Sequence, residues 1–222
     1  MEKMNVKFGE WFEKGFNLYK KDMGLLILAS LVAVILGAVT FGILAGPMLG
    51  GVFLITLAIF DESEPKPDIG NVFKGFDYFL NSFLFVIIWG ILIFIVSLIL
   101  NFIPCIGQLA SLFFIYSAQA FLMFGLFLIV DKRMDFWPAS KESIDKVKTN
   151  FWPFLGFSVV TSIIGSIGVI ACGIGIAITL PIQACMLTVA YRDIFNEVGK
   201  SEPAQEEPQT LTTPEGEAPH SE

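Results

Sequence analysis

The sequence predicts an all-α, polytopic membrane protein with six transmembrane helices arranged as three hairpins. Of its 222 residues, 55% are hydrophobic and 16% are charged, whereas soluble domains average about 45–50% apolar and about 25% charged residues. Three long segments, 23–60, 78–130 and 149–191, contain no Asp, Glu, Lys, Arg or His. A stretch containing Gly or Pro interrupts each segment once, and a membrane helix needs about 20 apolar residues. Each segment therefore supplies two membrane helices joined by a tight turn.

The first unit, at about residues 5–61, begins with an amphipathic helix. Trp11, Phe12 and Phe16 share one helical face, and most charged side chains lie elsewhere on the helix. This pattern predicts an interfacial helix whose aromatic face lies among the lipid headgroups, and an ordinary helix that packs on protein is the alternative. The apolar segment that follows breaks around Pro47, so its two helices of about 17–18 residues only just cross the bilayer.

The second unit, residues 69–131, holds the longest charge-free segment, with 53 residues. Its amphipathic start carries Phe73 and Phe76, which are predicted to anchor a second interfacial helix. The segment is interrupted once, around Pro104, and it ends abruptly at Asp131. These features predict an interfacial helix, a membrane helix, a tight turn and a second membrane helix.

The third unit, at about residues 136–193, repeats this plan. Trp137 is the predicted interfacial anchor, and Pro138 suits the first turn of a helix because that position needs no backbone donor. The apolar segment breaks near residues 171–175 and ends just before Asp193. A third membrane hairpin is therefore predicted.

All three units share one order of elements and end in an acid, which is Asp61, Asp131 or Asp193. This order indicates either a threefold internal repeat or the looser periodicity that any chain of hairpins shows.

The membrane domain is predicted to cover residues 1–198. Residues 199–222 are rich in Glu, Pro and Thr and are predicted to form a disordered acidic tail. Without the six glutamates of the tail, the net charge of the protein changes from −7 to −1. The membrane domain therefore has no excess of positive charge, and no nucleic-acid-binding face is expected.

The distribution of basic residues predicts the topology. With six spans, every Lys and Arg falls on one side of the membrane. Five Lys precede the first span, and five basic residues lie between Lys132 and Lys148. The positive-inside rule makes this side cytoplasmic, which places both termini in the cytoplasm and the protein in the cell membrane. The alternative, in which each segment crosses once, requires single membrane segments of 38 to 53 residues.

The predicted spans lack the charged groups that ion-moving proteins use. The single histidine, His220, lies in the tail. Proton-coupled pumps, voltage sensors and intramembrane zinc proteases keep ionisable side chains within the membrane, so the sequence argues against all three. It contains no phosphate-binding loop and no Cys/His metal-ligand spacing, and no cofactor is expected. Cys105 and Cys172 lie at the outer turns, where they either form a disulfide or remain free thiols.

Neutral polar residues within the spans are the remaining candidates for function. Asn101, Gln119 and Gln183 either tie helices together or line a cavity for a lipid or a solute. The sequence favours a non-catalytic scaffold, regulatory or lipid-interacting module with membrane lipids as partners, and it identifies no protein partner. The alternatives are a transporter or channel for an uncharged or lipidic substrate, and a lipid-modifying enzyme that uses the terminal acids of the units.

Four groups of residues carry a resemblance to a known family: residues 11–16, Gly46-Pro47 with Gly50, the set Ser143, Asp145 and Asn150, and residues 181–193. In these residues the chain resembles a loose group of uncharacterised bacterial integral membrane proteins. That group is similar to the membrane domain attached to some glycerophosphodiester phosphodiesterases. The soluble phosphodiesterase domain, with its metal-binding carboxylates, has no counterpart in this sequence. The resemblance therefore implies a membrane module and assigns no catalytic residue.

Overall fold

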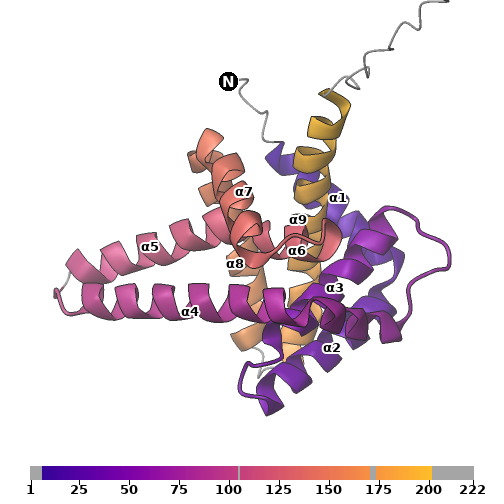
Figure 1. Ribbon diagram of the computed structural model, residues 1–222, viewed down its shortest axis with the longest axis horizontal. Helices are drawn as coiled ribbons and strands as arrows, with labels where there is room; N and C mark the ends of the chain where they lie inside the picture. The colour runs from indigo at the N-terminus through magenta and orange to yellow at the C-terminus, as the bar shows by residue number, and fades with distance from the viewer. Residues whose placement is uncertain (1–6, 105, 171–173, 202–222) are drawn as a thin grey trace, which may run out of the picture.

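The computed structural model of the protein describes residues 7–104, 106–170 and 174–201, and this part of the chain is helical and contains no strand. Figure 1 shows the arrangement of the helices. The elements in chain order are α1 (Phe8–Lys21), α2 (Met23–Val39), α3 (Ala45–Phe60), the 3₁₀-helix η1 (Ile69–Tyr78), α4 (Phe79–Asn101), α5 (Ile106–Leu122), α6 (Gly125–Asp131), α7 (Phe136–Thr149), α8 (Phe151–Ile170) and α9 (Ile174–Ser201). The all-α prediction is therefore confirmed.

Three elements, called lead-ins here, each precede a pair of apolar helices in the chain. The lead-ins are α1, η1 and α7, and α2 packs on α3, α4 on α5 and α8 on α9. Two details differ from the prediction. The second lead-in is a 3₁₀-helix, and the last helix of the second unit is divided at residues 123–124 into α5 and α6.

Four helical segments of the described chain are long and apolar enough to cross a membrane: Ile69–Asn101, Ile106–Asp131, Phe151–Gly168 and Gly175–Phe195. A fifth span results if α1 and α2, which are bent by 92° at their junction, are taken as one. The protein is therefore membrane-embedded, with four to five candidate spans where the sequence predicted six.

The difference from six spans lies in α2 and α3. The turn between them takes five residues of the first apolar segment, with Gly42 at φ 87°. The Thr40 hydroxyl donates to the Leu36 carbonyl at 2.7 Å and accepts from the Leu44 amide at 3.2 Å, which stabilises this turn. The remaining helices have only 17 and 16 residues. At 1.5 Å per residue α3 is about 24 Å long, against about 30 Å for the hydrocarbon core.

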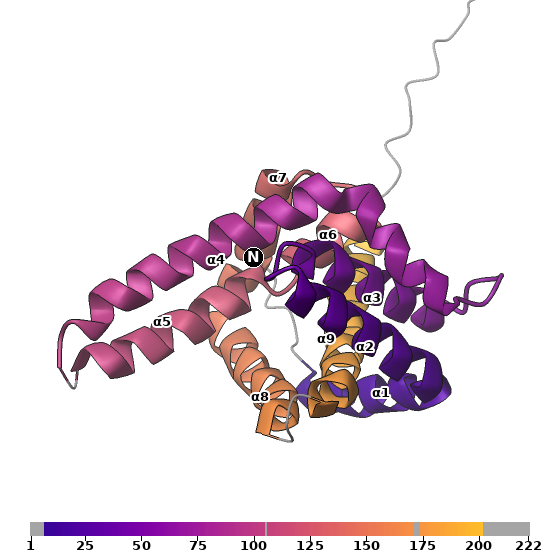
Figure 2. The same ribbon diagram turned by 90° about the horizontal axis from the view of Figure 1, so that it is seen from below.

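Helix α9 lies at the centre of the bundle, where it packs against α1, α2, α3 and α8 (Figures 1 and 2). Its buried face carries small residues such as Ala184 and Ala190, which allow neighbouring helices to approach. The contact with α1 is close enough that a Cβ on Gly15 would lie 2.7 Å from Met186 Cα. From this central position α9 contributes residues to both candidate sites, the Arg192 contacts and the groove.

The α4–α5 hairpin projects away from this bundle (Figures 1 and 2). Helix α4 carries apolar side chains on all sides, and many of them are exposed, with Phe94 at 64% and Ile99 at 62%. Such a surface is unfavourable in water and is the normal surface of a helix in lipid. The hairpin is therefore a membrane-facing element of the fold.

Close backbone packing joins α3 to η1. A Cβ on Gly51 of α3 would overlap the Val72 carbonyl, and a Cβ on Gly75 of η1 would overlap the Pro47 carbonyl. Only glycine fits at these positions, because the obstructing atoms belong to the backbone and cannot rotate away. The two glycines thus position the start of the second unit against the first.

Replacing Gly51 with alanine should destabilise the protein, because α3 and η1 must then separate. A cost of about 1–3 kcal/mol is expected for such overpacking, and thermal melting in detergent would measure it. Gly90→Ala in α4 is the matched control, since a Cβ at that position meets no atom within 4 Å. Equal melting temperatures for the two variants would contradict this account of the α3–η1 contact.

Candidate functional site

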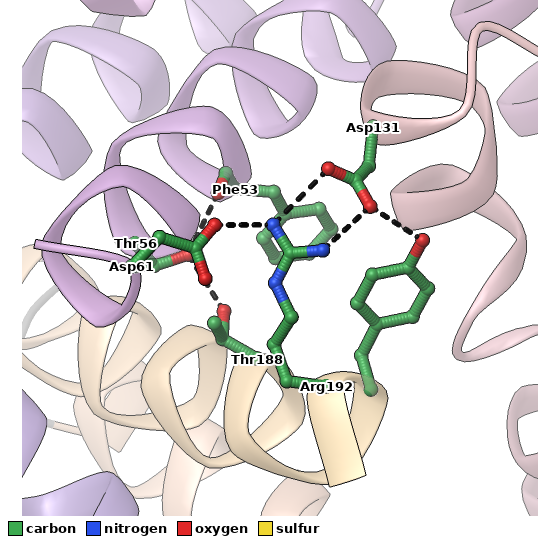
Figure 3. A network of polar contacts seen from close by, with 7 residues as sticks. Phe53, Thr56, Asp61, Asp131, Thr188 and Arg192 are labelled. Atoms are coloured by element: carbon green, nitrogen blue, oxygen red, sulfur yellow. Dashed lines mark hydrogen bonds and ion pairs between the residues drawn. The ribbon is translucent and has the colours of Figure 1, made fainter. Parts of the chain in front are cut away.

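Arg192 of α9 holds the ends of two other helices (Figure 3). Its Nη1 donates to Asp131 Oδ2 at 2.8 Å and its Nη2 to Asp131 Oδ1 at 3.2 Å, which forms a bidentate pair with the end of α6. Nη2 also donates to Asp61 Oδ2 at the end of α3. Planar guanidinium groups suit such paired contacts, which are stronger than those between neutral groups. One cation therefore connects α9 to α3 and α6.

Neutral hydrogen bonds extend this network. The Tyr191 hydroxyl donates to Asp131 Oδ2 at 2.8 Å. The buried hydroxyls of Thr56 and Thr188 lie 2.7 Å apart, and Thr56 also donates to the Phe53 carbonyl at 2.9 Å. A hydroxyl has only one proton to donate, so Thr188 must be the donor to Thr56. The Arg192 cluster is defined here as Asp61, Asp131, Tyr191 and Arg192. The threonine pair is a separate contact, which joins α9 to the backbone of α3 one helical turn before Arg192.

The third unit-ending acid, Asp193, has a different partner. Trp11 Nε1 of α1 donates to Asp193 Oδ2 at 2.7 Å. The Trp11 ring stacks on Phe154 and meets Phe157 edge-on, with centroid distances of 6.2 and 5.2 Å. With 2% of its surface exposed, Trp11 is buried in protein. The prediction that Trp11 anchors the interface is therefore wrong, because this position on α1 packs on α8 and α9, which was the alternative for this helix.

The Arg192 cluster is suited to fastening helices. Its three charged side chains are partly shielded, with side-chain exposures of 13% for Arg192, 23% for Asp131 and 37% for Asp61. Each carboxylate already accepts from a cation, and Asp131 accepts from a tyrosine as well. No group of three His, Cys, Asp or Glu side chains in the described chain is placed to hold a metal ion. The chemistry available here is therefore tethering.

A second feature is an open groove where the α4–α5 hairpin meets α3, α8 and α9. Its volume is about 480 Å³, which falls within the range of about 300–1,000 Å³ found for small-molecule pockets. One wall is apolar and the other carries neutral polar groups. The lining residues are Leu49, Phe53, Phe85, Val86, Ile93, Gln119, Leu122, Met123, Leu126, Ser158, Thr161, Ser162, Gly165, Ser166, Gln183 and Leu187.

Two carboxamides from different helices lie against α8 in this groove. Gln119 of α5 accepts through Oε1 a hydrogen bond of 2.9 Å from Ser162 of α8. The Gln183 side chain of α9 lies against Gly165 of α8, where an added Cβ would overlap Gln183 Oε1. Glycine at residue 165 thus makes the space that the Gln183 carboxamide occupies. Both glutamines singled out in the sequence therefore lie in one groove with α8 between them.

The third predicted cavity residue, Asn101, lies elsewhere. Its Nδ2 donates to the Ser97 carbonyl at 2.7 Å and to Ser111 Oγ at 3.3 Å, near the turn of the α4–α5 hairpin. It is absent from the groove lining and ties α4 to α5. For Asn101 the structure shows the helix-tying role that the sequence left open.

The remaining predicted anchors are more exposed than Trp11. The exposed fractions are 43% for Phe16, 49% for Phe73, 37% for Phe76 and 56% for Trp137. Phe12 is half-buried and packs on Phe157 at a centroid distance of 5.4 Å. Exposed aromatic side chains on lead-in helices suit the membrane interface, where one face is wet and the other apolar. Their position at an interface remains a prediction.

Another pocket, of about 490 Å³, lies beside the start of α2, between Lys21, Glu62 and the loop that contains Lys66. Lys21 Nζ and Glu62 Oε1 are 2.7 Å apart and form an exposed ion pair. The hydrogen bond and the positive charge of Lys21 lower the pKa of the Glu62 carboxyl. Solvent screens an exposed pair of this kind, so it has little part in holding the fold.

Several predicted features lie outside the described residues. They are Cys105, Cys172 and their disulfide, and residues 202–222 of the predicted tail. The start of that tail belongs to α9, which continues to Ser201.

The role of Arg192 was missed in the sequence. Its position directly after the third charge-free segment was visible, and so was an acid at the end of each unit. The pairing of Arg192 with two of these acids depends on which helix ends meet in the fold. The order of residues along the sequence does not contain this information. The serines and threonine of α8 were visible too, but only their common face toward α5 and α9 brings them to the groove.

No family model, curated protein or solved structure matches the chain at a significant level. The resemblance to the membrane domain of glycerophosphodiester phosphodiesterases therefore stays a prediction. The groove and the Arg192 cluster are the two features of the molecule that bear on its function.

Replacing Arg192 with methionine should destabilise the protein, because Asp61 and Asp131 lose their shared cation. A loss of about 1–3 kcal/mol is expected for charged hydrogen bonds in a partly shielded site, and melting in detergent would measure it. Lys14→Ala is the control, because it breaks the exposed pair with Glu10, which should contribute less than about 0.5 kcal/mol. A melting temperature unchanged by Arg192→Met would show that the cluster does not fasten the helices.

Proposed function

We propose that this protein is a non-catalytic, multi-pass module of the cell membrane that binds lipid in the groove between α3, α4, α5, α8 and α9. The observation that supports this most is the composition of the groove, with a neutral polar wall on one side and an apolar wall on the other. Such a surface matches an amphipathic molecule, whose polar part needs hydrogen bonds and whose apolar part needs to avoid water. The chemistry of the groove therefore favours lipid as the ligand.

We further propose that the chain crosses the membrane six times, as three repeated hairpins, with both termini in the cytoplasm. Helix α3 is short, but it packs against α2, α4, α6, α9 and η1, and most of its residues are buried. A helix enclosed by protein does not have to match the thickness of the lipid around it. The acids Asp61 and Asp131 lie at the same end of the bundle on Arg192, which supports one common charged side.

Reporter proteins fused after Glu64, Asp135 and Gly199 should all lie in the cytoplasm. All three positions follow a predicted hairpin, so an even number of crossings precedes each of them. Each position would be fused in turn to a reporter that is active only in the cytoplasm and to one that is active only outside the cell. The activities of the two reporters in cells would show on which side each position lies. One clear external signal would rule out the six-span arrangement.

Catalysis on lipids is less well supported than binding. The three acids that an enzyme would use are already engaged, two by Arg192 and the third by Trp11. A general acid or base needs to reach the proton it transfers, and these carboxylates point at their partners. The arrangement supports a structural role for all three acids.

Transport of an uncharged or lipidic substrate is the second candidate, favoured by a row of serines along α8. Ser158, Ser162 and Ser166 recur every four residues on the groove side of the helix. The row runs over nine residues, a rise of about 12 Å, whereas a transport path must cross about 30 Å of hydrocarbon. The length of the serine row therefore favours ligand binding over transport across the membrane. Flux into proteoliposomes that Gln119→Leu abolishes is the result that would favour transport.

Replacing Ser162 with tryptophan should block the groove and reduce lipid binding. The indole ring would occupy the space between α8 and α5, so lipid retained through purification should fall when measured by native mass spectrometry. Val160→Trp is the matched control, because Val160 is an exposed residue of α8 that does not line the groove. If the two variants retain the same lipid as the wild type, the groove is not the binding site.

A further inference from the structure

We propose that the groove selects an uncharged lipid with ester carbonyls and a free hydroxyl, the chemistry of a diacylglycerol, over lipids with a phosphate headgroup. This inference rests on the proposed function and specifies its ligand. It depends on three properties of the groove, which are its charge, its free hydrogen-bonding groups and the space made by Gly165.

Charge is the first property. None of the described residues that line the groove is Asp, Glu, Lys, Arg or His. A phosphate moved into this site would lose hydration and gain no counter-charge, which is strongly unfavourable away from water. An uncharged headgroup avoids this cost. The groove therefore discriminates by charge.

Free donors are the second property. Because Gln119 Oε1 accepts from Ser162, the oxygen end of the carboxamide is assigned and its NH₂ group points away from that bond. Among the described residues neither this NH₂ group nor the Gln183 carboxamide has a hydrogen-bond partner. Amide N–H groups are suitable donors to an ester carbonyl. The groove thus offers donors from α5 and from α9.

The hydroxyls of α8 complement these donors. Ser162 donates to Gln119, Thr161 to the Phe157 carbonyl at 2.9 Å, and Ser166 to the Ser162 carbonyl at 2.7 Å. The protons of these three hydroxyls are therefore already used within the protein, and their lone pairs remain as acceptors. A ligand that meets this wall needs a donor of its own, as a free hydroxyl supplies. Ester carbonyls and one hydroxyl together match the donors and acceptors present.

The third property is the space made by Gly165. Any side chain at this position would displace the Gln183 carboxamide, because the Cβ would overlap its oxygen. The apolar wall, which includes Leu49, Phe53 and Leu122, is available to the acyl chains. A volume of about 480 Å³ accommodates the glycerol backbone and the first part of the chains, and the rest extends into the bilayer.

The test uses the full chain in phosphatidylcholine vesicles that contain a photoactivatable diacylglycerol or the corresponding phosphatidic acid. The two probes differ only in the phosphate. Labelled peptides from α5, α8 and α9 are quantified against peptides from the exposed face of α4. Labelling of the groove by the diacylglycerol should exceed labelling by the phosphatidic acid by about tenfold or more, given the cost of an unpaired buried charge.

Variants then assign the contacts. Gln119→Leu/Gln183→Leu should reduce labelling by the diacylglycerol about tenfold, as expected for losing one or two hydrogen bonds. Gly165→Ala should also reduce it. Gly156→Ala is the control in the same helix, because a Cβ there would make an ordinary contact of 3.5 Å with Phe8. Unchanged labelling in the double variant would overturn the assignment of the two glutamines.

The two proposals fail in different ways. If phosphatidic acid labels the groove as strongly as diacylglycerol or more strongly, the inferred selectivity is wrong and lipid binding stands. If neither probe labels the groove above the exposed face of α4, both the ligand class and the proposed function fail. The comparison of the two probes on the wild-type protein does not depend on whether any variant folds.

Discussion

The pairing of Arg192 with Asp61 and Asp131 is the contact on which the rest of the arrangement depends. A guanidinium near the end of a membrane helix is costly unless carboxylates compensate it, and here they come from the ends of two other helices. One turn earlier on α9, Thr188 makes a second contact with α3 through Thr56, which donates to the Phe53 carbonyl. The Phe53 ring stacks on Phe127 at a centroid distance of 4.1 Å and forms part of the groove wall. Phe53 therefore takes part both in the contact between α3 and α9 and in the wall of the candidate groove.

The groove and the Arg192 cluster separate two kinds of polar chemistry. Charged residues lie outside the three long apolar segments, where water and counter-charges reduce their cost. The polar groups of the groove are neutral amides and hydroxyls, which tolerate an apolar setting when they are hydrogen-bonded. A ligand that completes the unused hydrogen bonds of Gln119 and Gln183 would stabilise this wall. The same separation is the basis of the proposed preference for an uncharged lipid.

Some features followed directly from the sequence because they depend on local composition. Long segments without charge predicted apolar helices, and apolar helices occupy these segments, with described breaks at residues 40–44 and 102–104. Gln119 and Gln183 were singled out because few polar side chains occur in these helices. Trp11 shows the limit of such a pattern. An aromatic face looks the same whether it meets lipid or protein, and only the position of α8 and α9 decided that Trp11 is buried.

By itself the sequence determined that this is an all-helical membrane protein whose charged residues lie outside three long apolar segments. A charged side chain in the hydrocarbon is strongly unfavourable in any fold, so its position is restricted before the tertiary contacts form. The tertiary structure decided which ends meet, that α2 and α3 are short, and that two glutamines share a groove while Asn101 does not. These outcomes depend on contacts between residues far apart in the chain. The overlap that excludes a side chain at Gly165 exists only once α8 and α9 are packed together.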